Sequence, residues 1–158
     1  MKTIAILYSE NTPVLDAVIS KLDDYNYQLL TAFPENPDDF DLIIDVNFKN
    51  DIKSNVLKCH YSLLPSFQSD EPLREAFLEG VKVTGITVYF TDPVRILAQY
   101  PVFIRNDAHY DDILQEMEYL EQVIFPIVIE KILLNEPFDI QDLLKGNKCS
   151  GGCSGCRH

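Results

Sequence analysis

The last ten residues of the chain contain three of its four cysteines. Cys149, Cys153 and Cys156 form a C-x3-C-x2-C pattern, and His158 follows two residues after the last cysteine. Thiolate and imidazole groups are common zinc ligands, so these four side chains would complete a Cys3His set. Three cysteines with one open iron position are also typical of an iron–sulfur cluster. The spacing therefore predicts a zinc or iron–sulfur site. The alternative is a thiol-rich tail that serves only redox exchange.

A second group of reactive side chains lies in "KCHYS", residues 58–62. The pKa of an unperturbed histidine is near neutrality, so His60 is a candidate general acid or base. The preceding Cys59 has a thiol that could act as a nucleophile. Neighbouring residues of a strand point to opposite faces, so we expect Cys59 in the core and apart from His60. The alternative for His60 is a structural position at the end of a strand.

The bulk composition excludes several classes of partner. A chain of 158 residues with 46% hydrophobic residues suits one folded domain. Its net charge of −12 argues against binding to nucleic acid or to an anionic membrane surface. The chain has no apolar run long enough to cross a membrane. The start, "MKTIAILYS", lacks the features of a secretory signal and is predicted to be a strand, so we expect a cytoplasmic protein.

Apolar and amphipathic segments alternate along the chain. The patterns predict strands at residues 3–9, 27–33, 41–46, 55–62, 81–90 and 94–104, and helices at residues 11–25, 70–80, 107–134 and 139–146. The β-α-β-β order at the start predicts an open, Rossmann-like, mostly parallel sheet flanked by helices, an α/β fold. Residues 1–146 form the predicted domain, and residues 147–158 form a flexible cysteine-rich tail.

Turn-forming residues refine these predictions. Asp70 is the expected cap of the second helix, and Gly80 its expected end. Pro101 should break the last strand, and Pro126 should kink or split the long helix. Gly85, inside a strand, indicates a bulge or a close approach of another backbone segment.

Four segments in one order resemble a known family. They are "CHYSLLPSF", "REAFLEGVKVTGITVYF", "ILAQYPVF" and "LEQVIFPIVIEKIL". Together they resemble phosphoribosylglycinamide formyltransferase and the related folate-dependent formyltransferases over about residues 55–135. The resemblance implies a formyltransferase-like fold. It also implies transfer of a formyl group from 10-formyltetrahydrofolate to an amine, as in the one-carbon steps of purine biosynthesis.

The resemblance assigns three catalytic candidates. His60 occupies the position of the family's histidine, and Lys58 occupies the position of its asparagine. The loop that carries the family's aspartate is shortened here to "FTDPVRILAQ", in which Asp92 is the remaining carboxylate. The family reaction forms a tetrahedral oxyanion, so these groups would stabilise that charge and move protons.

The same comparison places the substrate contacts. It implies that Ser9 and Asn11 in the first loop, and Ser62 beside His60, bind the substrate. The first loop, "YSENTPV", has no glycine, and Glu10 would repel a phosphate there. The segment "VNFKNDIK" also differs from the folate-contacting segment of the family. The standard catalytic and phosphate-binding motifs are therefore predicted to be eroded.

Two hypotheses follow. In the first, the chain is a shortened formyltransferase-like enzyme that acts on a small-molecule amine. In the second, it is a non-catalytic protein of the same fold that binds a metal or an iron–sulfur cluster through its C-terminal cysteines, in a redox or regulatory role. The sequence leaves open whether the protein forms a homodimer.

Overall fold

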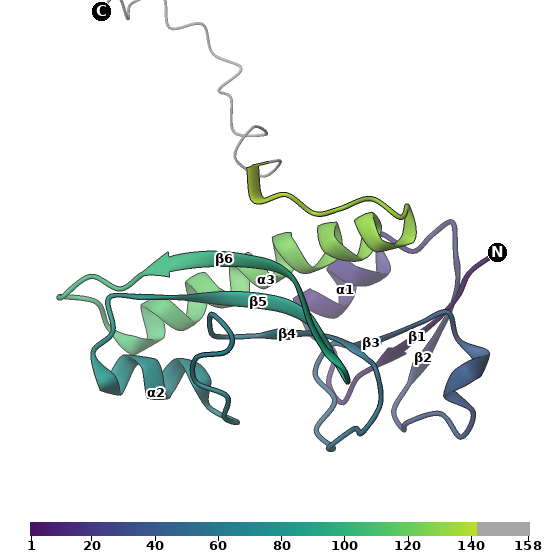
Figure 1. Cartoon of the computed structure of the whole chain (residues 1–158), viewed down its shortest axis with the longest axis horizontal. Helices are drawn as coiled ribbons and strands as arrows, with labels where there is room; N and C mark the ends of the chain where they lie inside the picture. The colour runs from purple at the N-terminus through teal and green to yellow at the C-terminus, as the bar shows by residue number, and fades with distance from the viewer. Residues whose placement is uncertain (142–158) are drawn as a thin grey trace, which may run out of the picture.

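The computed structural model describes residues 1–141, which form one six-stranded sheet with helices packed on it (Figure 1). The strands are β1 (Thr3–Leu7), β2 (Asn26–Leu30), β3 (Leu42–Asp45), β4 (Leu57–His60), β5 (Val83–Thr91) and β6 (Val94–Phe103). The helices are α1 (Pro13–Ile19), α2 (Pro72–Glu79) and α3 (Tyr110–Leu133), with a short 3-10 turn, η1 (Pro37–Asp39).

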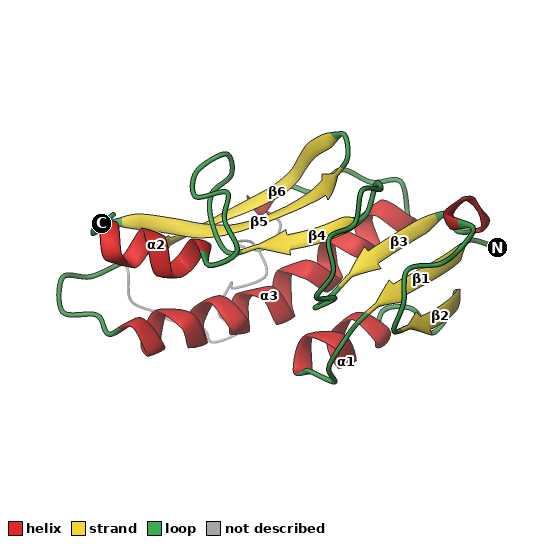
Figure 2. Ribbon diagram, turned by 90° about the horizontal axis from the view of Figure 1, so that it is seen from below, coloured by secondary structure: helices red, strands yellow, loops and turns green. Residues whose placement is uncertain are grey.

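The sheet confirms the predicted mostly parallel, Rossmann-like architecture. Its strand order is β2-β1-β3-β4-β5-β6. Strands β1 to β4 pair in parallel, whereas β5 runs antiparallel to both β4 and β6 (Figure 2). The carboxyl ends of β1, β3 and β4 therefore meet at one edge. The strand order reverses at β1, and such a switch point is where open α/β sheets bind ligands.

Two apolar clusters hold the sheet in place. The larger includes Ile6 of β1 and Ile44 of β3, and α3 contributes Met117, Ile124 and Phe125. Helices α1 and α3 contact each other and lie on the same side of the sheet (Figure 1). Successive residues of a strand point to opposite faces, so half of the strand residues lie on the face away from α1 and α3. That face carries the second cluster, which consists of Ala5, Leu7, Ile43, Phe48 and Val56.

Two local predictions were wrong, and a third, for Pro126, was wrong only as to a split of the helix. Strand β6 continues through Pro101, because β6 is an edge strand and the missing N–H of proline costs no ladder bond on its outer side. Helix α3 is not split at Pro126, which is buried inside it, where packing offsets the lost backbone bond. Glu71, not Asp70, takes the N-cap position of α2. The prediction that Gly80 ends this helix is confirmed, since Gly80 has the left-handed φ of 71°.

Gly85 allows the close backbone approach that the sequence predicted. A Cβ atom there would overlap the Tyr100 carbonyl oxygen and lie 2.7 Å from Leu63 Cδ2. We expect Gly85→Ala to lower the free energy of unfolding by about 2–3 kcal/mol, the upper range for overpacking, as measured by urea denaturation. The control is Gly80→Ala. A Cβ atom at residue 80 would have no non-neighbouring atom within 4 Å. Gly80→Ala should therefore lower the free energy of unfolding only through backbone strain, by about 1 kcal/mol. Equal losses in both variants would contradict this account.

Candidate active site

His60 is the last residue of β4, at the carboxyl edge of the parallel strands. Its Nδ1 lies 2.9 Å from Ser62 Oγ, and this hydroxyl donates its proton to the Ser66 carbonyl oxygen at 2.7 Å. Because a hydroxyl has one proton, Ser62 Oγ must accept the Nδ1–H of His60. The ring also meets that of Tyr89 edge-on, with centroids 6.2 Å apart. With its proton on Nδ1, the neutral ring has Nε2 as its basic atom.

The surroundings of His60 favour the neutral imidazole. Partial burial lowers its pKa below the ordinary 6.5, and the nearby ammonium of Lys58 lowers it further. The backbone of Ser69 acts in the opposite direction without reversing the shift. His60 is therefore a base at neutral pH, ready to accept a proton.

Lys58 lies on the same face of β4 as His60, two residues earlier. Its Nζ is 3.7 Å from Oδ2 of Asp45, the residue that pairs with it on β3. Asp45 is 3% exposed, and its Oδ1 accepts the backbone N–H of Phe48 at 2.9 Å. Burial raises the pKa of Asp45, while Lys58 opposes that rise. The pair places a cation beside His60 with a buried carboxylate behind it.

The opposite face of β4 and the residue after it meet helix α3. The Tyr61 hydroxyl donates a hydrogen bond to Oε2 of Glu121, which is only 8% exposed. Burial raises the pKa of Glu121 to about 7, and the charges of Glu118 and Asp45 add to the rise. Cys59 packs against the main core cluster, as predicted, and burial raises the pKa of its thiol well above the ordinary value. Cys59 is therefore a neutral thiol rather than a nucleophilic thiolate.

Sequence reasoning did not identify Glu121 as a site residue, although its spacing carried a signal. Glu121 follows Met117 by four residues and precedes Ile124 by three, so it lies on the apolar face of the helix. A glutamate on a buried face is seldom left without a partner. Here its partner is Tyr61.

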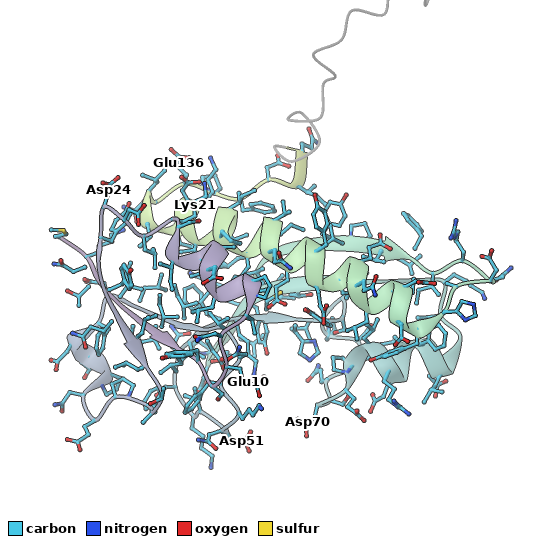
Figure 3. All side chains as sticks on the ribbon, turned by 180° about the vertical axis from the view of Figure 1, so that it is seen from behind. Glu10, Lys21, Asp24, Asp51, Asp70 and Glu136 are labelled. Carbon is cyan, nitrogen blue, oxygen red and sulfur yellow. The ribbon has the colours of Figure 1, made fainter. Side chains whose placement is uncertain are left out.

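Two cavities meet at His60. One, of about 470 Å³, lies between the end of β3, the end of β4, the start of α2, and α3. The other, of about 540 Å³, lies between β4, β5, β6 and the loop before α2. Both are bordered by Lys58, His60, Ser69 and Asp70. Figure 3 labels Asp70 and Glu10, which lie along the same edge of the molecule.

A third cavity, of about 280 Å³, extends the first toward α1. It lies between Thr12 and Pro13 at the start of α1 and Glu118 and Gln122 of α3. It shares four bordering residues with the 470 Å³ cavity: Val46, Asn47, Tyr61 and Glu121. We call it the α1–α3 cavity.

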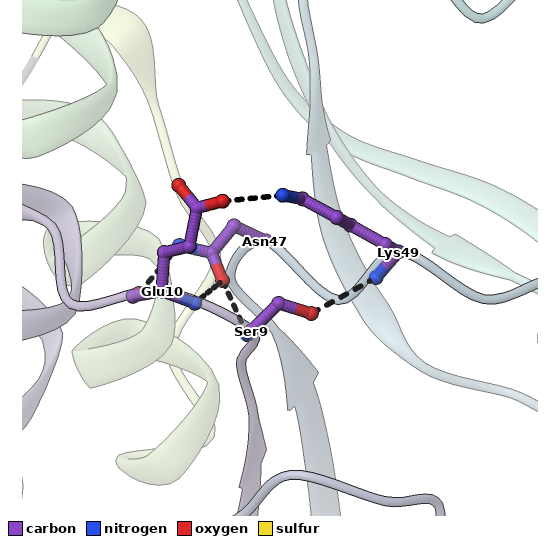
Figure 4. A network of polar contacts seen from close by, with 4 residues as sticks. All are labelled: Ser9, Glu10, Asn47 and Lys49. Carbon is purple, nitrogen blue, oxygen red and sulfur yellow. Dashed lines mark hydrogen bonds and ion pairs between the residues drawn. The ribbon is translucent and has the colours of Figure 1, made fainter.

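The loop after β1 is tied to the loop after β3 (Figure 4). Oδ1 of Asn47 accepts the backbone N–H groups of Ser9 at 2.7 Å and of Glu10 at 3.2 Å. Nδ2 of Asn47 donates to the Glu10 carbonyl oxygen at 2.8 Å. Lys49 forms an ion pair with the Glu10 carboxylate, and its backbone N–H donates to Ser9 Oγ. Asn47 was not among the predicted site residues, and its signal in the sequence is its place just after the buried strand β3.

The structure does not gather all the site residues predicted from sequence. Ser62 lies at His60, whereas Ser9 lies in the Asn47 network. Asn11 is exposed and borders none of the three cavities just described. Asp92 is exposed in the turn between β5 and β6 and does not border the two cavities at His60. The roles of these residues stay predictions.

The cysteine-rich tail lies outside the described residues, as do Cys149, Cys153, Cys156, His158 and the predicted domain boundary at residue 146. Within residues 1–141, no group of His, Cys, Asp or Glu side chains is arranged to hold a metal ion. None of the helices described in that range is long and apolar enough to cross a membrane.

Comparison with known proteins gives one consistent result. The model of the "Formyl transferase" family matches residues 38–129. Phosphoribosylglycinamide formyltransferase of Bacillus subtilis is 35% identical over 82 residues, which are 49% of this chain and 42% of that protein. Formyltetrahydrofolate deformylase 1, mitochondrial, of Arabidopsis thaliana is 26% identical over 111 residues, which are 68% of this chain and 32% of that protein. The matched stretches thus span less than half the length of these relatives.

Solved structures show the same fold. Glycinamide ribonucleotide transformylase 1 from Geobacillus kaustophilus superposes with a TM-score of 0.71 at 17% identity, covering 84% of this chain and 99% of that one. Phosphoribosylglycinamide formyltransferase from Bacillus halodurans gives a TM-score of 0.68 at 17% identity, covering 84% and 95%. The likeness in fold therefore covers 84% of this chain in both comparisons.

Proposed function

We propose that the chain, which belongs to the formyl transferase family, transfers a formyl group from 10-formyltetrahydrofolate to an amine at His60. One observation carries the proposal. Two cavities of different chemical character share an edge at Lys58, His60, Ser69 and Asp70. A transfer between two substrates needs both to reach one set of catalytic groups, and this arrangement supplies that set.

The 540 Å³ cavity fits the donor. It is bordered by Leu64, Pro65, Val94 and Ile96, together with the ring of Tyr89. A pterin is a flat heteroaromatic ring, and aliphatic and aromatic walls suit such a ring. Gln68 and Thr91 border the same cavity and offer polar groups that would orient it.

The 470 Å³ cavity fits the acceptor. It continues into the α1–α3 cavity, and Glu121 borders both. The pKa of Glu121 is about 7, and its ionised form attracts the ammonium form of an amine and holds it close to the shared edge. The ammonium first loses one proton to solvent, which leaves a neutral amine able to attack the formyl carbon. His60 is placed to accept the second proton, which the nitrogen releases after the attack.

The proposed formyl transfer has two stages, attack by the amine and release of tetrahydrofolate. The amine nitrogen attacks the formyl carbon, a C–N bond forms, and the carbonyl electron pair moves to oxygen. The Lys58 ammonium stabilises this oxyanion, and Nε2 of His60 takes the proton of the attacking nitrogen. The bond from the formyl carbon to N10 of the folate breaks, and N10 takes up the proton. The products are a formamide and tetrahydrofolate. For Asp92, in the turn beside Thr91, a catalytic role stays a prediction.

Titration of the full chain with 10-formyltetrahydrofolate and with a non-hydrolysable folate analogue tests the proposal. Calorimetry should show saturable binding of both compounds with one site per chain. Absence of binding at millimolar concentration would overturn the enzymatic proposal.

The donor cavity gives a sharper prediction. Ile96 of β6 is 43% exposed and borders this cavity. We expect Ile96→Glu to raise KM for the donor about tenfold, because it removes apolar contact and adds a charge, while KM for the amine stays unchanged. The control is Val83→Glu at an exposed position of β5, 42% exposed and outside the two cavities at His60. The assignment of this cavity fails if both variants raise the donor KM equally.

Water is a second candidate acceptor. Several relatives are formyltetrahydrofolate deformylases, including that of Haemophilus influenzae, which is 27% identical over 93 residues. With water in place of the amine, the same attack at the formyl carbon would release formate. The product therefore distinguishes the two acceptors.

The C-terminal cysteines keep their own prediction. Zinc or an iron–sulfur cluster would be held by Cys149, Cys153, Cys156 and His158. Metal analysis after anaerobic purification should find metal in the full chain and less in a chain that lacks residues 147–158. Equal metal content in both would remove this prediction.

A further inference from the structure

We infer that the acceptor amine carries no phosphate group, because Asn47 occupies the backbone amides that would bind one. This inference rests on the proposed function and specifies its substrate as an unphosphorylated, cationic amine. The backbone amides in question lie where the loops after β1 and β3 meet, at the switch point of the sheet.

Asn47 takes the role of an internal acceptor. A bound phosphate is usually held by backbone N–H groups that follow a strand. Here the N–H groups of Ser9 and Glu10 both point at Oδ1 of Asn47, at 2.7 and 3.2 Å. The amide is held in turn by its own bond to the Glu10 carbonyl oxygen. A phosphate would have to displace an acceptor that is fixed on both sides.

Two positions at the start of α1 also have no N–H group to offer a phosphate. The Leu15 N–H donates to Thr12 Oγ1, which caps α1. Pro13 has no N–H to offer. The Glu10 carboxylate adds a negative charge at this loop and takes up the Lys49 ammonium as an ion pair. The Glu10 carboxylate, paired with Lys49, thus lies beside the two amides that Asn47 already holds.

The charges around the adjoining space favour a cation. The side chains of Glu118 and Glu121 border the α1–α3 cavity, and among residues 1–141 no lysine, arginine or histidine borders it. In the 470 Å³ cavity, Lys58 is paired with Asp45, and Arg74 lies among Asp70 and Glu71. An amine that carries further positive charge gains from this field, whereas a phosphate is repelled by it.

A matched pair of compounds tests the inference. Glycinamide riboside and glycinamide ribonucleotide differ only by one phosphate, and each is titrated by calorimetry into the full chain saturated with the folate analogue. We expect the riboside to bind at least tenfold more tightly. Equal affinity, or tighter binding of the ribonucleotide, would overturn the inference. Failure of the folate analogue to bind would overturn the proposed function instead, so the two failures are distinct.

A second measurement does not depend on turnover. Inorganic phosphate is added to the 15N-labelled full chain, and the amide signals of Ser9 and Glu10 are followed by NMR. They should not move in the wild type. They should move in the double variant Asn47→Gly, Glu10→Gln, which frees the amides and removes the charge. The amide signals of Ser9 and Glu10 should not shift in Asn47→Asp, because this variant keeps the side-chain oxygen that accepts both N–H groups. Phosphate-dependent shifts in the wild type, or none in the double variant while it remains folded, would contradict the inference.

Discussion

Replacing His60 with asparagine is expected to lower kcat for formyl transfer about 10²–10⁴-fold, the range for loss of a positioned general base. The physical reason is the basic Nε2 of a neutral ring whose orientation is fixed by the bond from Nδ1 to Ser62. In the wild type, kcat/KM should rise with pH through an apparent pKa below 6.5, because burial and Lys58 lower the pKa of His60. Steady-state assays from pH 5 to pH 8 measure both effects.

His109 provides the matched control. It is exposed at the N-cap of α3 and makes no side-chain cap hydrogen bond. His109→Asn should therefore leave kcat unchanged. If His60→Asn retains wild-type kcat, or if both variants lose activity equally, His60 is not the catalytic base.

Replacing Glu121 with glutamine is expected to remove a large part of the pH dependence of stability. The pKa of Glu121 is raised from 4.5 to about 7 in the folded chain. Between these values the folded state holds a proton that the unfolded state has lost, so stability falls as pH rises from about 4.5 to about 7. The wild type should lose up to about 3 kcal/mol more over this interval than Glu121→Gln. Urea denaturation at a series of pH values measures the difference.

The groups that face Glu121 remain in the variant. They are Tyr61, Glu118 and Asp45, and the pKa of Asp45 is also raised, so some pH dependence should persist. Glu116→Gln is the control, because Glu116 is exposed on the same helix. Parallel pH curves for the wild type and Glu121→Gln would show that Glu121 does not hold this proton.

The fold was largely predictable because its elements are specified locally. The buried runs at β1 and β3 and the apolar face of α3 follow from residue type and period. Pro101 and Pro126 were misjudged because their cost depends on position, namely an edge strand and a packed helix. The local sequence around a proline does not show whether its strand lies at the edge of the sheet or whether its helix is buried.

The site was only partly predictable. Lys58 and His60 are two residues apart at the end of one strand, so a short motif found both. Asn47 and Glu121 act through residues that are 38 and 60 positions away, Ser9 and Tyr61. Only the folded sheet brings such pairs together. The first loop, predicted to be eroded because it lacks glycine and carries Glu10, has an internal partner in Asn47 that the sequence did not reveal.

The most direct test of the proposed reaction follows one labelled carbon. The full chain is incubated with 10-formyltetrahydrofolate labelled with 13C in the formyl group and with glycinamide riboside, and the products are read by 13C NMR. The account predicts that the label appears in a formamide with the wild type and not with His60→Asn. Label that stays on the folate, or appears only in formate, would contradict transfer to an amine.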